Sequence, residues 1–150
     1  MDVQPIAVTT DQCVEDSNID YGTCRWQTLF GRDDHDAPMT LGYATFPSHG
    51  VLHLHHHDDA EFYYCTRGSG LVTIDDQLIE LAPNMAVMIP GGSIHGVQAG
   101  PDGLEFLYGF ANQPKFSNVN YQFLEIIGQT HEGPSAMPAE DCVAPQGTNI

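Results

Sequence analysis

The chain has 150 residues, of which 41% are hydrophobic and 16% charged, and this suits one globular domain with a core. Four Lys and Arg against twenty Asp and Glu give a formal net charge of -16. Nucleic acids and anionic membrane surfaces are therefore excluded as partners, because few basic side chains are present to neutralise phosphates. No apolar run reaches the ~20 residues of a membrane helix, and the start lacks the pattern of a secretory signal, so we expect a cytoplasmic location.

The predicted elements are short strands. Residues 1–20 are polar and weakly patterned, and we interpret them as an N-terminal extension. After them, runs rich in β-branched and aromatic residues alternate with Gly, Pro and Asp turn signals, which include "RGSG" at 67–70 and "AGPDG" at 99–103. This spacing predicts an all-β sandwich or barrel over residues 21–127. The runs are 25–30, 40–46, 51–57, 61–67, 71–76, 77–81, 86–90, 96–100 and 104–110.

Three further segments complete the chain-order prediction. "LVTIDDQLIEL" reads as a hairpin that turns at Asp75 and Asp76. For residues 116–128 the sequence predicts either a last strand or a short helix. Residues 128–150 are rich in Pro, Gly and small residues, which predicts a flexible C-terminal tail.

The cysteines form no CxxC pair, and in a cytoplasmic chain we interpret them as free thiols: Cys13, Cys24, Cys65 and Cys142.

The stretch "HLHHHDDAEFYYC" begins with four of the chain's eight histidines within five residues. If residues 51–57 form a strand, alternation places His53, His55 and His57 on one face. A short turn then brings Glu61, on the next strand, close to His55 and His57. Two imidazoles and a carboxylate at this spacing form half of a site for Fe, Mn, Co, Ni or Zn. A surface histidine cluster is the alternative, but the leucines at period two and the carboxylate at a fixed offset favour the metal.

The second half of such a site lies in "NMAVMIPGGSIHGV". An apolar strand ends at Pro90, Gly91 and Gly92 make a sharp turn, and His95 follows three residues later. An isolated histidine in an apolar strand is more often a core group than a ligand. Here the turn redirects the chain just before His95, and the first cluster lacks one ligand, so we predict that His95 completes the site.

These two stretches resemble the two motifs of the cupin superfamily. The first motif, G(x)5HxH(x)3–4E(x)6G, is matched from His55 to Gly68, although Gly50 is one residue closer than the pattern asks. The second, G(x)5PxG(x)2H(x)3N, is matched at Pro90, Gly92 and His95. Asn84 stands at its first glycine and Ala99 at its last asparagine. Asparagine tolerates the left-handed backbone that such a turn requires, so the departures affect turn residues and leave the ligand positions intact.

The cupin resemblance spans roughly residues 25–125 and implies a small double-stranded β-helix, or jelly-roll, barrel. It also implies one divalent transition metal per chain, with a ligand set that has four members: His55, His57, Glu61 and His95. His56 is expected to face away from the metal. Small cupins pair into dimers, so the resemblance implies a homodimer that acts on a small-molecule substrate.

Additional segments resemble the small single-domain dimethylsulfoniopropionate (DMSP) lyases: Arg25–Trp26, Leu41–Ala44, Gly68–Gly70, Leu104–Phe106 and Phe116–Tyr121. This resemblance implies β-elimination, which cleaves the C–S bond of DMSP and releases dimethyl sulfide and acrylate. Tyr63, two residues after the glutamate ligand, would be the general base, and Tyr121 would contact substrate. Trp26 would hold the sulfonium by cation–π contact, and His53 would line the pocket.

Three other functions fit the same ligand residues. They are an iron-dependent dioxygenase of the small cupin type, a sugar-processing cupin isomerase, and a metal-bearing module that binds ligands without turnover. An anaerobic assay separates the lyase from the dioxygenase, because elimination needs no oxygen. Tyr63 beside the ligand set is the argument against the non-catalytic module.

Overall fold

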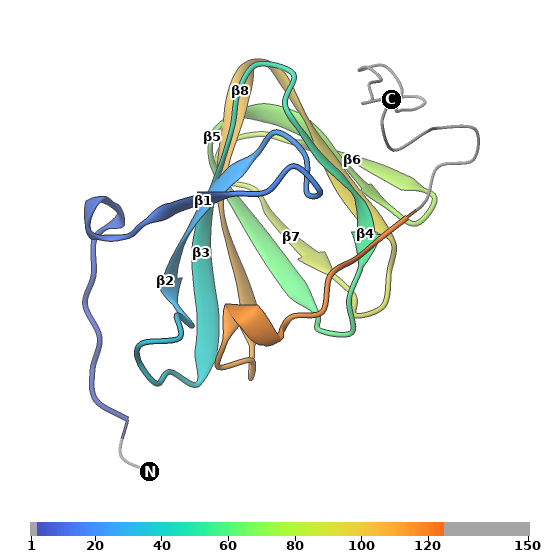
Figure 1. Ribbon diagram of the computed structural model, residues 1–150. Coiled ribbons are helices and arrows are strands. Elements are labelled where there is room, and N and C mark those ends of the chain that lie inside the picture. The colour runs from blue at the N-terminus through green and yellow to red at the C-terminus, as the bar shows by residue number, and fades with distance from the viewer. Residues whose placement is uncertain (1–2, 125–150) are drawn as a thin grey trace.

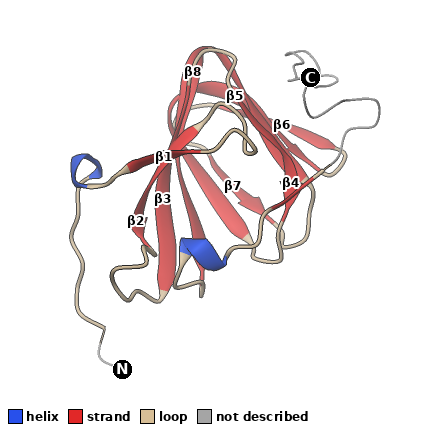
Figure 2. Cartoon of the chain, viewed as in Figure 1, coloured by secondary structure: helices blue, strands red, loops and turns tan. Residues whose placement is uncertain are grey.

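A computed structural model describes residues 3–124 as one curled antiparallel sheet of nine strands (Figure 1). Two short 3-10 turns, η1 (Thr10–Gln12) and η2 (Phe116–Asn118), accompany the strands (Figure 2). The all-β prediction is confirmed. The strands are β1 (Glu15–Ser17), β2 (Arg25–Phe30), β3 (Met39–Phe46), β4 (Val51–His56), β5 (Glu61–Ile74), β6 (Gln77–Leu81), β7 (Ala86–Ile89), β8 (His95–Ala111) and β9 (Gln122–Phe123).

Strands β5 and β8 form the spine of the sheet. They pair antiparallel along most of their length, from Phe62 opposite Gly109 to Ile74 opposite His95. One path through the sheet runs β1-β2-β3-β8-β4-β9, while β6 and β7 pair with β5. Strand β8 therefore has three partners, since its C-terminal half also pairs with β3 and its N-terminal half with β4. This arrangement brings β4, β5 and the start of β8 together.

The two glycine-rich segments at 67–70 and 99–103, predicted as turns, instead lie within the continuous strands β5 and β8. They face each other, with Gly68 opposite Leu104, and the register shifts here at β-bulges. Gly68 has φ +80°, and a Cβ added to it would lie 2.2 Å from the carbonyl oxygen of Gly103. The glycines thus bend two paired strands in place, where the sequence pattern had predicted chain reversal.

The ends of the described chain extend the sheet. The predicted hairpin at Asp75 is confirmed, and Asp75 itself has φ +51°. After η2, β9 pairs with β4, so residues 116–123 contain both a helical turn and a strand. Strand β1, inside the predicted N-terminal extension 1–20, pairs with β2 at the sheet edge. The domain boundaries stay predictions, and the predicted tail at 128–150 lies outside the described residues.

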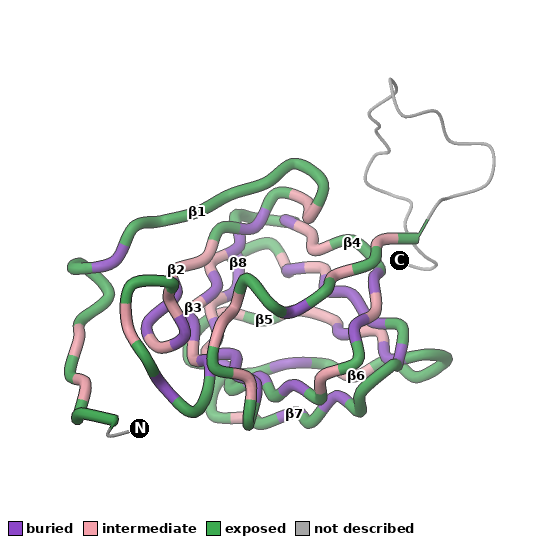
Figure 3. Tube along the Cα trace, turned by 60° about the horizontal axis from the view of Figure 1, so that its bottom comes forward, coloured by how far each residue is buried: buried purple, intermediate pink, exposed green. Residues whose placement is uncertain are grey.

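The core lies between the inward faces of the curled sheet, and buried residues alternate with more exposed ones along β3, β7 and the start of β5 (Figure 3). Strand β3 shows the alternation most clearly, as every second residue from Thr40 to Phe46 is buried. Tyr63 packs face to face on Phe106 with ring centroids 4.1 Å apart, and both belong to the hydrophobic core cluster. Within the described residues, Cys13, Cys24 and Cys65 are buried free thiols, and Cys142 lies outside them.

Candidate metal centre and its cavity

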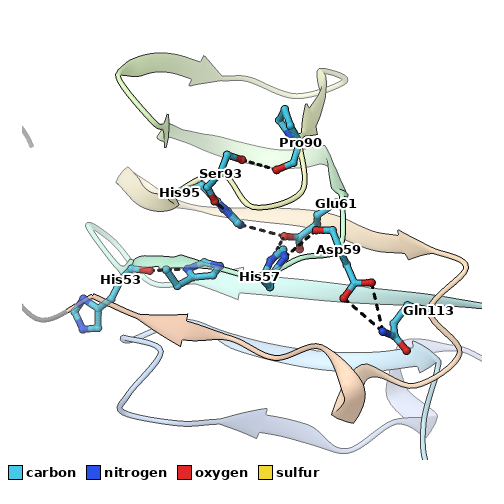
Figure 4. Close-up of polar contacts among 9 residues, drawn as sticks. His53, His57, Asp59, Glu61, Pro90, Ser93, His95 and Gln113 are labelled. Atoms are coloured by element: carbon cyan, nitrogen blue, oxygen red, sulfur yellow. Dashed lines mark hydrogen bonds and ion pairs between the residues drawn. The ribbon is translucent and has the colours of Figure 1, made fainter.

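His55, His57 and His95 come together inside the sheet, as the spacing predicted. Their side chains are buried, and one nitrogen from each lies within 4.8 Å of the others. His55 is on β4, His57 follows that strand, and His95 begins β8, where it is paired directly with His55. Figure 4 shows His57 and His95 pointing toward Glu61 from two different segments of the chain.

The three imidazoles share one tautomer. In each, Nδ1 lies at hydrogen-bond distance from a main-chain carbonyl two residues away. A carbonyl oxygen only accepts, so Nδ1 carries the proton and the Nε2 lone pair faces the centre of the cluster. The bonds are 2.8 Å from His55 to His53, 2.9 Å from His57 to Asp59 and 3.0 Å from His95 to Ser93.

Glu61 supplies an oxygen to the same centre. Its carboxylate is buried, and Oε1 lies 3.2 Å from Nε2 of His57 and 3.3 Å from Nε2 of His95. Nε2 of His55 is buried and has no hydrogen-bond partner among the described residues. With the protons on Nδ1, these nitrogens and the carboxylate are all acceptors facing one another, so a cation is needed between them. Three imidazoles and one carboxylate suit a divalent transition metal.

The charges at the centre agree with this need for a cation. Burial, helped by the neighbouring His95, lowers the pKa of His55 to about 2, so its imidazole stays neutral as a metal ligand must. Burial also acts to lower the pKa of His57, but the hydrogen bond and charge of Glu61 outweigh it, and the pKa is raised.

The glycine turn before His95 packs directly against the main chain of His57 and Asp58. The amide of Gly92 donates a 2.8 Å hydrogen bond to the carbonyl of His57. A Cβ on Gly91 would lie only 2.2 Å from the carbonyl oxygen of Asp58, and Gly92 has φ +82°. Both positions therefore require glycine, one for close approach and the other for its backbone angle. This contact fixes the place of His95 relative to His57.

Asn84 replaces the first glycine of the second cupin motif without disturbing the turn. Its φ is +75°, in the left-handed region that asparagine tolerates better than most residues. Its amide donates a 2.8 Å hydrogen bond to the carbonyl of Cys65. The sequence-based expectation for this position is confirmed, and the departure from the motif leaves β7 paired with β5.

The assignment of His53 to the pocket lining is corrected by the structure. Leu52 pairs with Val97 but His55 pairs with His95, so β4 carries one extra residue between them. This β-bulge reverses the alternation upstream of His55. The side chain of His53 is exposed and points away from Glu61 and His95 in Figure 4. Leu52 takes the place in the cavity wall that strict alternation gave to His53.

A cavity opens beside the cluster, and its lining includes four residues that were predicted as functional: Glu61, Trp26, Tyr63 and Tyr121. The sequence reasoning missed several other lining residues, among them Tyr21, Cys24, Tyr108 and Phe116. For Tyr108 a signal existed, because alternation in "LEFLYGF" puts it on the same face as buried Phe106 and Phe110. For Tyr21, which precedes β2 in a loop, the sequence carried no such signal.

Aromatic rings form one wall of the cavity, here called the aromatic wall: Tyr21, Trp26, Phe116 and Tyr121. Tyr21 stacks on Trp26 with ring centroids 4.7 Å apart and lies 4.8 Å from Tyr121. Tyr121 in turn stacks on the imidazole of His55, again at 4.8 Å. The aromatic wall therefore touches the metal-ligand cluster directly.

Two further phenols, Tyr63 and Tyr108, line the same cavity. Tyr63 and Tyr108 are 1% and 4% exposed, and neither hydroxyl has a hydrogen-bond partner among the described residues. Burial raises the pKa of Tyr63 well above its ordinary value, and the charge of Glu61 adds to the rise. Burial also raises the pKa of the Cys24 thiol, to about 12. In the metal-free protein these groups are all protonated.

Comparisons with known proteins agree with the cupin fold and with the histidine site. The family model described as "Cupin domain" matches residues 42–108. Over 104 residues the chain is 43% identical to dimethylsulfoniopropionate lyase DddW of Ruegeria pomeroyi, a stretch that covers 69% of this chain and 68% of that protein. Both findings agree with the cupin motifs around His55 and His95.

Solved structures of similar fold have much lower identity. A single-residue variant of the oxalate decarboxylase of Bacillus subtilis superposes with a TM-score of 0.69 at 20% identity, over 82% of this chain and 33% of that chain. The chain thus spans about a third of that enzyme. The polyketide cyclase RemF of Streptomyces resistomycificus has a TM-score of 0.69 at 18% identity, over 82% and 87%. These two likenesses establish the fold alone. In the part of the chain that the structure describes, no helix has the length and apolarity to cross a membrane.

Proposed function

The chain belongs to the cupin superfamily, and we propose that it is a metal-dependent lyase that cleaves DMSP into dimethyl sulfide and acrylate. The observation that carries the proposal is that Tyr63, whose buried hydroxyl has no hydrogen-bond partner among the described residues, lines the same cavity as Glu61 and the aromatic wall. The 43% identity to a protein named as a DMSP lyase supports the choice of substrate.

The metal would be held by Nε2 of the three histidines and by the carboxylate of Glu61, because their lone pairs already converge. When bound, a divalent ion holds the substrate carboxylate, stabilises the negative charge that develops as the α-proton leaves, and lowers the pKa of a nearby phenol. The residues keep this arrangement because each Nδ1 is anchored to the main chain.

The aromatic wall would bind the cationic end of the substrate. A sulfonium offers no hydrogen-bond donor or acceptor, so ring faces are the side chains best able to hold it. Trp26 and Tyr121 both contact Tyr21, and together they enclose apolar space next to His55. On this proposal the sulfonium would lie against the aromatic wall and the carboxylate toward Glu61 and the histidines. The substrate then lies across the cavity with its α-carbon between the two sides.

Tyr63 would be the general base. As phenolate it takes the proton from the carbon next to the carboxylate, the electron pair of that C–H bond forms the new C=C bond, and the C–S bond breaks with its pair remaining on sulfur. The products are acrylate, dimethyl sulfide and one proton, which the phenol returns to solvent. The Tyr63 hydroxyl has no hydrogen-bond partner within the described residues, so it is free for this task.

The test is headspace detection of dimethyl sulfide after DMSP is added to purified, metal-loaded protein, run in parallel without oxygen. We expect equal dimethyl sulfide and acrylate in both atmospheres. Product that forms only with oxygen would support the dioxygenase, and binding of DMSP without product would support the non-catalytic module. The homodimer and the cytoplasmic location stay predictions.

A further inference from the structure

Tyr108 is a buried phenol in the cavity to which the proposed reaction assigns no role. It lies on β8 directly opposite Tyr63 of β5, so the two side chains stand next to each other on the inner face of the sheet. Its side chain is 4% exposed, and its hydroxyl, like that of Tyr63, has no hydrogen-bond partner among the described residues. An unpaired buried hydroxyl is costly, so its retention points to a partner that arrives with the ligand.

The end of the Tyr108 ring packs against the main chain at Gly42. It lies on β3 directly opposite Tyr108, on the other side from Tyr63. A Cβ added to Gly42 would lie 2.2 Å from Cζ and 2.3 Å from the hydroxyl oxygen of Tyr108. The ring therefore lies across β3 over a position that has no side chain. Phe110 and Phe116 pack against it with centroids 6.2 and 5.9 Å away, which holds the hydroxyl in one place.

The surroundings of the Tyr108 hydroxyl favour a neutral donor. Burial raises the pKa of Tyr108 well above its ordinary value, the charge of Glu61 adds to this, and the nearby Thr28 hydroxyl opposes it. A phenol that keeps its proton donates a hydrogen bond, and the partner it suits best is an anion. The sulfonium end of DMSP cannot accept a hydrogen bond, whereas its carboxylate can.

We propose that Tyr108 contacts the substrate and donates a hydrogen bond to its carboxylate, where negative charge grows as the α-proton leaves. This inference rests on the proposed lyase function for its substrate. It divides the two adjacent phenols by role: Tyr63 takes a proton, while Tyr108 keeps its own. A preorganised donor of this kind strengthens its bond as charge develops, so it acts on the turnover number as well as on binding.

The experiment compares Tyr108→Phe with wild type and with Tyr64→Phe, the exposed neighbour of Tyr63. Turnover of DMSP and bound metal are measured, and propionate, an unreactive carboxylate, is titrated into each metal-loaded protein by calorimetry. For Tyr108→Phe we expect the turnover number to fall roughly 100-fold and propionate affinity roughly tenfold, with metal content unchanged. Tyr64→Phe should match wild type in all three.

Gly42→Ala gives a second way to displace the same hydroxyl, should Tyr108→Phe prove unstable. Its Cβ would occupy the ring's place, and we expect a similar loss of propionate affinity with metal retained. Unchanged turnover and propionate affinity in Tyr108→Phe, or in Gly42→Ala if the first does not fold, would overturn the proposal. If the wild-type protein makes no dimethyl sulfide, only the lyase proposal fails. The contact between Tyr108 and a carboxylate is still tested by the propionate titration.

Discussion

The two sides of the cavity are held in different ways. On the metal side, His55 and His95 come from paired strands, and each imidazole is anchored to a main-chain carbonyl. The aromatic wall is drawn largely from connecting segments, with Tyr21 before β2 and Tyr121 before β9, and its rings contact each other by stacked and tilted packing. Directed hydrogen bonds fix positions, whereas packing between aromatic rings tolerates adjustment. We expect changes on the metal side to abolish function and changes on the aromatic wall to weaken affinity.

Removing a ligand should have the largest effect. In His55→Ala and in His95→Ala we expect metal affinity to fall at least ~100-fold, because even the outer partners of metal ligands contribute roughly 10–100-fold. Elemental analysis of the purified proteins measures this directly. Full metal occupancy in both variants would refute the ligand assignment and, with it, the contrast between the two sides.

Tyr63→Phe should retain the metal and the fold but lose at least ~100-fold in turnover, the usual contribution of a general base. The ring still stacks on Phe106, so packing is preserved and the missing hydroxyl accounts for the loss. Steady-state rates and bound metal are measured on the same preparation. Undiminished turnover would remove Tyr63 from this role.

Acid should lower the free energy of unfolding of the metal-free protein because His55 is buried in its neutral form. Its pKa is about 2 when folded and 6.5 ordinarily, so below pH 6.5 the unfolded chain binds a proton that the folded chain excludes. Stability therefore decreases as the pH falls, by about 1 kcal/mol from pH 6.5 to 5.5 for this residue. Denaturant unfolding of metal-free wild type and His55→Ala should differ by that amount in pH dependence. Equal pH dependence would contradict the assigned burial of His55.

Trp26→Leu tests the aromatic wall. We expect KM for DMSP to rise between ~2-fold and ~30-fold, which corresponds to the ~0.5–2 kcal/mol of a cation–π contact, while the turnover number changes little. Initial-rate kinetics over a wide substrate range separate the two parameters. A large fall in turnover with KM unchanged would mean that Trp26 contributes to the reaction step, as the metal side does, and not to substrate affinity.

The smallest effect is expected for His53→Ala. Its side chain is exposed, and its contact with the cluster is made by the main-chain carbonyl, which alanine keeps. Metal content and turnover should match wild type, and the free energy of unfolding should change by less than ~0.5 kcal/mol. A loss of metal here would place the imidazole in the site after all.

The sequence predicted the ligand cluster because each half depends on local rules. Alternation over His55 and His57, and a glycine turn before His95, are set by a few adjacent residues. The β-bulge that turns His53 outward depends on how β4 pairs with β8, which lies far along the chain. The glycines of 67–70 and 99–103 were equally consistent with turns or with bends, and only their mutual pairing decides between them. Non-local pairing thus accounts for the errors at His53 and at the two glycine-rich segments.

The main-chain anchors of the three imidazoles have a consequence for redesign. Since the accepting atom at position 53 belongs to the peptide backbone, the side chain there can be exchanged without altering which nitrogen of His55 carries hydrogen. Position 53 is also exposed, so it leaves solvent-facing room for new groups. An engineer could therefore graft a label or a charge beside the centre while its coordinating geometry stays insulated from the change.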